Sequence, residues 1–410
     1  MTAALSQHPL VEAARARVDA ARADRVGVNA LPNPTGTFWF ENTAFPGQSL
    51  GVPLNRETST YMTLPLEPFI QRSSRIRRAD EDLKAAQASL TSARRQVAAE
   101  AVRGFFRVAL AQAMTEEAEE NRDRLEQLLS YNRARVDEGV TAEGEWLRVQ
   151  LELDRASTEV TFADVDLARA RTELAPYLGN LGGQPNAVAF RVNVPSLPAP
   201  APSSIPRMDV VLAAAREHRP ERLGGQARIA AASATADVER TLSVRQFGAT
   251  FGNKRVEGQN SMVLGVSLAV PLFNRNRSGV ERAMSERLAA EQELAWTDRQ
   301  VTAEVQGAHD SAMRFARRLA DLQQSFLSRA EEMHRLTLGA YQEGGASLLQ
   351  VLDATRLLAD ARLTYARTLF AQHQSLFDLA LAASGEPNDS LDLLRAWSAS
   401  AVATQTGATR

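Results

Sequence analysis

The residue types that most often hold metals or perform catalysis are sparse in this 410-residue chain. Cysteine is absent, and no two of the five histidines are four residues apart. No glycine-rich phosphate loop follows a strand pattern, and no nucleophile stands beside a base. We therefore expect no metal site, no cofactor and no enzyme activity. Structural roles are expected for His8, His218, His309, His334 and His373.

The charge balance argues against a nucleic-acid partner. Lys and Arg number 47 against 49 Asp and Glu, which gives a net charge of −2. A polybasic surface is therefore not expected. No apolar run reaches the roughly 18 residues of a transmembrane helix. The first residues do not read as a signal peptide, which predicts a cytoplasmic chain unless the sequence is trimmed or its start is misplaced.

Two landmarks recur at a nearly constant spacing and predict an internal duplication. Gly139 and Gly344, each after a glutamate, are 205 residues apart, and the Pro-Leu pairs at Pro65 and Pro271 are 206 apart. The predicted organisation is a first repeat over 1–178, a Pro/Gly-rich connector over 179–206 with one short strand over 187–194, a second repeat over 207–385 and a C-terminal tail over 386–410. Each repeat is predicted to consist of a helix, two strands and a long helical hairpin.

Long helices are predicted in each repeat because the chain lacks the residue that breaks them. No proline occurs between Phe69 and Ala175 or between Leu272 and Glu386. Apolar residues follow seven-residue spacing, as in the series Leu294, Val301, Ala308, Phe315 and Leu322, which indicates supercoiled packing. A helix of about 70 residues would extend roughly 105 Å. The fold class is therefore mainly α, with hairpin tips near 139 and 344.

Four short segments alternate apolar with small or polar residues and are predicted as strands: about 35–43, 58–66, 244–253 and 261–270. A polar loop over Lys254 to Asn260 is expected between the last two. The length and alternation fit transmembrane β-strands. Four strands cannot close a barrel alone, whereas three chains would supply twelve. The alternative is a pair of surface hairpins on a helical protein.

The stretch "GGASLLQVLDATRLLADARLTYA" from Gly344, the "VPLF" after the last strand and the two-copy layout resemble outer-membrane efflux channels of the TolC family. Lys254 to Gly258 and the longer stretch "VPLFNRNR" look most like the CzcC/CusC heavy-metal branch. The resemblance implies a homotrimer with a 12-stranded barrel in outer-membrane lipid and a helical tunnel in the periplasm. It also implies a periplasmic adaptor of the membrane fusion type and an inner-membrane pump of the resistance-nodulation-division type.

The resemblance assigns the two hairpin turns to contact with the adaptor. Glycine tolerates the backbone geometry that ends a helix, so both turns are expected to reverse the chain. The predicted contact residues are Glu138, Gly139, Val140, Glu343, Gly344 and Gly345.

The resemblance also assigns a gate beside the second turn. Of two acidic positions three residues apart, the second matches Asp353 and the first is Gln350, so one acidic ring is kept and the other lost. A tyrosine before the turn matches Tyr341, and its acidic partner matches Glu145. A family arginine falls on Ala346, so that polar link is missing. The alternative role for Asp353 is a helix residue that pairs with Arg356.

The function predicted from these features is a passive exit duct for a tripartite exporter, with heavy-metal cations as cargo. Drugs, organic solvents or polypeptides of type I secretion are alternative cargoes. A soluble coiled-coil scaffold is the alternative of another class. The predicted location of the duct is the outer membrane with a periplasmic extension.

Overall fold

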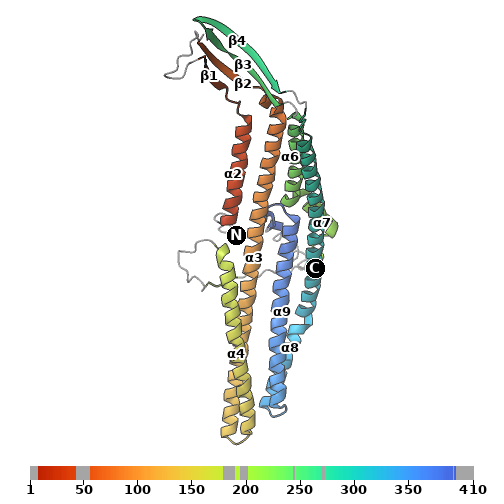
Figure 1. Cartoon of the computed structure of the whole chain (residues 1–410). Helices are drawn as coiled ribbons and strands as arrows, with labels where there is room; N and C mark the ends of the chain where they lie inside the picture. Colours follow the sequence, from red (N-terminus) through yellow and green to blue (C-terminus); the bar gives the residue numbers. More distant parts are fainter. Residues whose placement is uncertain are drawn as a thin grey trace, which may run out of the picture. The chain divides into compact units, whose positions relative to one another are not determined.

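The chain is mainly helical with one small antiparallel sheet, as predicted (Figure 1). A computed structural model describes residues 8–42, 56–178, 190–193, 202–242, 245–269, 273–390 and 392–393. None of the helices in these segments combines the length and apolar character that a bilayer crossing requires. The helices are α2 (Pro9–Asn29), α3 (Glu67–Asp137), α4 (Glu143–Leu174), α5 (Met208–His218), α6 (Pro220–Thr241), α7 (Arg277–Asp321), α8 (Leu327–Gln342) and α9 (Leu348–Ala383), with short 3₁₀ turns at Ala175–Tyr177 and Pro202–Ser204.

The first long helix is continuous, whereas the second is interrupted. Helix α3 runs for 71 residues without a break. Helix α7 ends at Asp321 and a π-helical turn, Leu322–Phe326, separates it from α8. A π turn shifts the phase of the residues that follow it. The predicted heptad series ends at Leu322, which is where this turn begins.

The second repeat also begins differently from the prediction. One helix was expected before its strands, but α5 and α6 are separated at Arg219 and Pro220. Proline lacks the amide hydrogen that would continue α5, and it drives the preceding residue towards extended backbone. Arg219 has φ −66° and ψ 120°, as this effect requires.

The four strands form one sheet in the order β1 (Thr35–Glu41), β2 (Glu57–Pro65), β3 (Arg245–Val256) and β4 (Gln259–Ala269). All neighbours are antiparallel, and β2 pairs with β3 although they lie far apart in sequence. Predicted end residues 43, 244 and 270 and the Pro271 landmark lie outside the described residues. The expected loop over Lys254 to Asn260 is wrong, because Glu257 and Gly258 both have positive φ and form a two-residue turn.

The two faces of the sheet differ in polarity. Cross-strand registration places Phe38, Thr60, Asn253 and Met262 on one face and Thr37, Tyr61, Gly252 and Val263 on the other. The first face is rich in large apolar side chains that remain exposed: Phe38, Phe40, Met62, Phe251, Met262, Leu264, Val266 and Leu268. The second face is rich in Thr, Ser and Gly, and Lys254 pairs there with Glu57 at 2.5 Å.

The chain forms two compact units that do not follow its two halves. The sheet unit comprises Ala14–Leu90 and Glu221–Thr297, and the hairpin unit comprises Met1–Ala13, Thr91–Pro220 and Asp298–Arg410. The hairpin unit has one apolar cluster among α5, α7 and α9 and another between α3 and α9. Buried Arg95 of α3 donates to the carbonyl oxygens of Leu381 and Ser384, which caps the C-terminal end of α9.

Two predicted segments beside these units are only partly described. A short strand was expected over 187–194 of the connector, but residues 190–193 do not pair as a strand, and the rest lies outside the described residues. The tail begins with helical residues at 387–390, and Leu393 packs against the cluster of α5, α7 and α9.

Candidate functional site

The two hairpin turns have the same backbone hydrogen bonds. Gly139 and Gly344 have φ of 73° and 82°, in the left-handed region that favours glycine. The Val140 amide donates to Arg135 at 2.9 Å, and the Gly345 amide, 205 residues later, donates to Ala340 at 2.7 Å. Each turn glycine also donates its amide to the carbonyl three residues earlier. This pair of bonds is the Schellman motif, which satisfies the last carbonyl groups of α3 and α8.

The residues predicted to contact an adaptor lie on the surface of these turns. All six are exposed, and Val140 presents an apolar side chain to solvent. They are Glu138, Gly139 and Val140 in the first turn and Glu343, Gly344 and Gly345 in the second. Accessible side chains and fixed backbone make both turns suitable for a protein partner.

Tyr341, the last buried residue before the second turn, joins the two hairpins. Its hydroxyl donates to Oδ1 of Asn132 on α3 at 2.6 Å. Asn132 is 0% exposed and donates in turn to the carbonyl of Leu128. The guanidinium of Arg135 lies over the Tyr341 ring at 5.1 Å. Burial raises the pKa of the Tyr341 hydroxyl, so it stays a hydrogen-bond donor at neutral pH.

Glu145, the predicted partner of Tyr341, adds to the rise that burial causes in the pKa of the Tyr341 hydroxyl, but the two side chains form no hydrogen bond in the described structure. Glu145 is exposed in the first turn of α4. Among the hydrogen bonds of the described residues, Tyr341 reaches Asn132 and not Glu145. Within a single chain the tyrosine therefore fixes α8 to α3 rather than to the start of α4.

Gln350 and Asp353 have different surroundings on α9. Gln350 forms a capping box with Ser347. Its side-chain Oε1 accepts from the backbone amide of Ser347 at 2.8 Å, and its backbone amide donates to Ser347 Oγ. Asp353 is exposed, and its carboxylate has no hydrogen bond or ion pair within the described segments. Arg356 pairs with Glu152 of α4 instead of Asp353. Gln350 is thus committed to the helix start, whereas Asp353 is available to solvent.

An apolar cluster beneath the turns holds these residues in place. It draws side chains from four helices, so each hairpin packs against the other. Its buried members are Leu125, Leu128, Val149, Ala156, Tyr341, Leu348, Val351 and Leu352.

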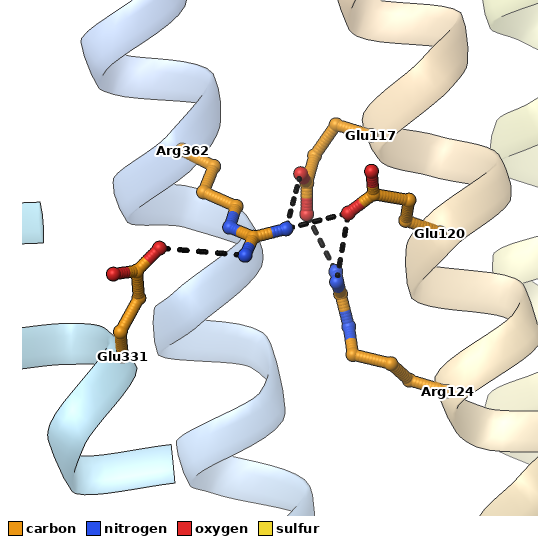
Figure 2. Close-up of polar contacts among 5 residues, drawn as sticks. All are labelled: Glu117, Glu120, Arg124, Glu331 and Arg362. Atoms are coloured by element: carbon orange, nitrogen blue, oxygen red, sulfur yellow. Dashed lines mark hydrogen bonds and ion pairs between the residues drawn. The ribbon is translucent and has the colours of Figure 1, made fainter. Parts of the chain in front are cut away.

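An ion network farther along the hairpins links α3, α8 and α9 (Figure 2). Arg362 of α9 pairs with Glu117 at 3.3 Å and Glu120 at 2.5 Å, both on α3, and with Glu331 of α8 at 3.4 Å. Arg124 pairs with the same two glutamates of α3. Glu117 is nearly buried, so its carboxylate depends on these partners.

The residues that join the hairpins were not predicted from the sequence. Asn132 and Tyr341 are more than 200 residues apart, as are Arg362 and its two glutamates on α3, so no local pattern reveals these contacts. The Ser347–Gln350 capping box is different, because the spacing of serine and glutamine is itself a known helix-start signal. That signal could have identified the role of Gln350.

The hairpin unit offers no metal-binding constellation in its described part. No group of three or more His, Asp and Glu side chains could hold a metal ion among the described residues of either unit. A groove of about 500 Å³ between α3, α4 and α9 is lined by both acidic and basic groups, including Glu159, Asp166, Arg155 and Arg367. Such a mixed lining favours neither cations nor anions.

Comparison with known proteins identifies the family. The pattern of the family described as outer membrane efflux protein matches residues 1–180 and 211–385. The cobalt-zinc-cadmium resistance protein CzcC of Cupriavidus metallidurans is 25% identical over 368 residues, which cover 89% of this chain and 84% of that protein.

Two solved channels share the fold. The outer-membrane channel OprN matches with a TM-score of 0.76 at 20% identity, over 94% of this chain and 89% of its own. CusC matches with a TM-score of 0.72 at 18% identity, over 94% and 91%. The chain therefore belongs to the outer membrane efflux protein family of TolC-like channels, and it is an outer-membrane efflux channel with a periplasmic helical extension.

Proposed function

We propose that three copies of this chain form the outer-membrane duct of a tripartite exporter whose cargo is heavy-metal cations. The observation that carries the trimer is the pair of free sheet edges. Among the described strands, β1 and β4 each pair with one neighbour only. Unpaired backbone groups are costly in lipid, and four strands are too few to close. Three copies supply twelve strands and leave no edge.

The polarity of the sheet supports the same assembly. Phe38 and Met262 on the apolar face are 70% and 78% exposed, so their side chains have no cover within the chain. The opposite face carries small and polar residues, as the water-filled side of a barrel does. The apolar face would lie against outer-membrane lipid.

The hairpin turns supply the surface for the remaining partners. Two equivalent turns in each of three chains make six similar contacts, which suits a six-copy ring of periplasmic adaptor. The contact would use Glu138, Gly139 and Val140 together with Glu343, Gly344 and Gly345. The adaptor would connect the duct to an inner-membrane pump of the resistance-nodulation-division type, which supplies energy and selectivity.

Metal cations as cargo are supported by one relative's name and by one side chain. CzcC is named for resistance to cobalt, zinc and cadmium. Asp353 is exposed and unpaired in the described structure, so three copies could place three carboxylates around the duct axis. An acidic ring concentrates cations without binding them tightly. Gln350 contributes no charge, and its amide is used by the capping box.

Metal tolerance of a deletion strain tests the cargo. We expect loss of tolerance to Co, Zn and Cd that the intact gene restores, with little change in tolerance to dyes and antibiotics. Sensitivity to dyes, antibiotics or solvents alone would replace the metal assignment with multidrug export. Loss of a secreted polypeptide would replace it with type I secretion.

Single-channel recordings test the role of Asp353. Trimers of the wild type and of Asp353→Asn, verified by crosslinking, are compared in planar bilayers under a salt gradient. We expect the variant to lose cation preference, which is read from the reversal potential. Asp164→Asn, a change at an exposed acid of α4, is the matched control. Equal reversal potentials in all three proteins would remove Asp353 from the conduction path.

A further inference from the structure

Large apolar side chains are exposed where the chain leaves the sheet for the long helices. Phe69 and Ile70 lie in the first turn of α3, a few residues after β2 ends at Pro65. Phe273 lies between β4 and α7 and is 100% exposed. The exposed apolar face of the sheet extends to Leu268, five residues before Phe273. The apolar surface therefore continues past the strand ends.

Arginines accompany these apolar residues in both repeats. Arg72 of α3 and Arg277 of α7 are 205 residues apart, the spacing of the two turn glycines. Arg275 stands two residues after Phe273. The first turn of α7 contains no acidic residue.

The charges of these arginines are weakly compensated. Arg72 donates to the side-chain amide oxygen of Asn29 at 2.7 Å, and this neutral partner leaves its positive charge in place. Arg275 has no hydrogen bond or ion pair among the described residues. Within the described segments Arg277 pairs only with Glu281, at 3.1 Å on an exposed surface, where an ion pair contributes little to stability.

The opposite end of the sheet has a different character. Glu41 and Glu57 face each other across β1 and β2, and Lys254 neutralises one of them. Arg255 and the exposed ring of Phe40 also lie at that end. What differs is the pair of facing glutamates, which offsets the basic charge there.

We infer that Phe69, Ile70, Phe273, Arg72, Arg275 and Arg277 form a junction belt that binds anionic phospholipid headgroups of the periplasmic leaflet. The inference rests on the sheet lying in the outer membrane. Aromatic and aliphatic side chains settle at the boundary between acyl chains and headgroups. The planar guanidinium group matches a phosphate with two parallel hydrogen bonds. The belt fixes the depth at which the sheet sits, and it selects lipids by charge.

Lipid retention by purified trimers tests the belt. Wild-type protein is reconstituted in vesicles of phosphatidylcholine alone or mixed with phosphatidylglycerol, and the lipid that stays bound after extraction is counted by native mass spectrometry. We expect retained phosphatidylglycerol to bind about fivefold more weakly for each arginine removed, in R275Q and in R275Q/R277Q. High salt should lower wild-type retention to the level of the double variant.

Two further variants separate charge from packing. Arg329→Gln removes an exposed arginine of α8 in the hairpin unit and should leave retention unchanged. Phe273→Ser should weaken retention of both lipids equally, because it removes apolar contact and keeps the charge.

Several results would overturn the belt. Equal phosphatidylglycerol retention by wild type and R275Q/R277Q would do so. If water-soluble glycerol phosphate competes for the belt as effectively as vesicles do, the arginines form a phosphate site and not a lipid site. Dissociation of R275Q/R277Q trimers in lipid-free detergent would assign these arginines to contacts between copies. Failure of the wild type to form trimers or conduct in either vesicle would instead refute the proposed duct.

Discussion

The two helical hairpins end in turns with matching backbone hydrogen bonds, yet the helices beside those turns differ. Helix α3 reaches the first turn without a break, whereas a π turn interrupts the path from α7 to α8. The N-cap residue of α4, Ala142, makes no side-chain cap, whereas α9 begins with the Ser347–Gln350 capping box. The two turns therefore share their backbone hydrogen bonds, whereas the helix caps beside them differ.

The difference indicates where each hairpin obtains its rigidity. A continuous α3 is held by its own backbone hydrogen bonds. Helix α8 follows an interruption, so its position depends more on side-chain contacts with α3. Tyr341 of α8 contacts α3 directly, and Glu331 of α8 is linked to α3 through Arg362 of α9. If the two hairpins relied on the same contacts, the changes below would affect both equally.

The largest expected effect comes from breaking the buried link between α8 and α3. Asn132→Ala leaves the buried Tyr341 hydroxyl without its acceptor, which costs about 2–3 kcal/mol of unfolding free energy. Hydrogen exchange should show faster opening of α8 than of α4. Tyr365→Phe is the control, because that hydroxyl is exposed and accepts only from Gln323 at 3.2 Å. If Tyr341→Phe lowers the unfolding free energy no more than Tyr365→Phe does, the link does not hold α8.

The turn glycines test whether the two turns are equivalent. Space for an added Cβ is open at both Gly139 and Gly344, so only the positive φ opposes alanine. Each change to alanine should lower the unfolding free energy by about 1–2 kcal/mol, and the two decreases should agree. Gly144→Ala provides the contrast, because helix α4 there has ordinary φ and open space, and alanine should stabilise it by up to about 1 kcal/mol. Unequal costs, measured by urea unfolding in detergent, would end the claim of equivalence.

What the sequence could and could not predict follows from the range of the interactions. The strands, the turn positions and the absence of proline between Phe69 and Ala175 are local patterns, and the TolC-family resemblance they support is confirmed by the family match. The break at Pro220 was equally local and was missed. The π turn after Asp321 carries no breaker residue, and Asn132 meets Tyr341 only through the packed fold. The assignments of Asp353, Glu145 and the turn residues remain predictions.

Changes at the helix caps should alter stability by a smaller amount, with opposite signs in the two hairpins. Ser347→Ala should destabilise the start of α9 by about 1 kcal/mol, because Ser347 Oγ accepts from the Gln350 amide. Ala142→Ser, at the uncapped start of α4, should stabilise by a similar or smaller amount. Hydrogen exchange at the first four amides of each helix measures both. If neither rate changes, the caps do not account for the difference between the hairpins.

Mild acid should loosen the second hairpin selectively, and this is the smallest effect we predict. Burial lowers the pKa of His334 on α8, with Arg124 and Arg362 adding to the shift, and burial lowers the pKa of His373 on α9. Each histidine then binds a proton less readily folded than unfolded, so its share of stability is complete above about pH 6.5 and is lost as the pH falls below that value. Helices α3 and α4 contain no histidine. Hydrogen exchange, corrected for its intrinsic pH dependence, should therefore show opening of α8 and α9 between about pH 7 and 5.5, above the range in which carboxylates of ordinary pKa titrate. His334→Gln with His373→Gln should abolish that change, and equal loosening of α3 and α4 would assign it to other groups.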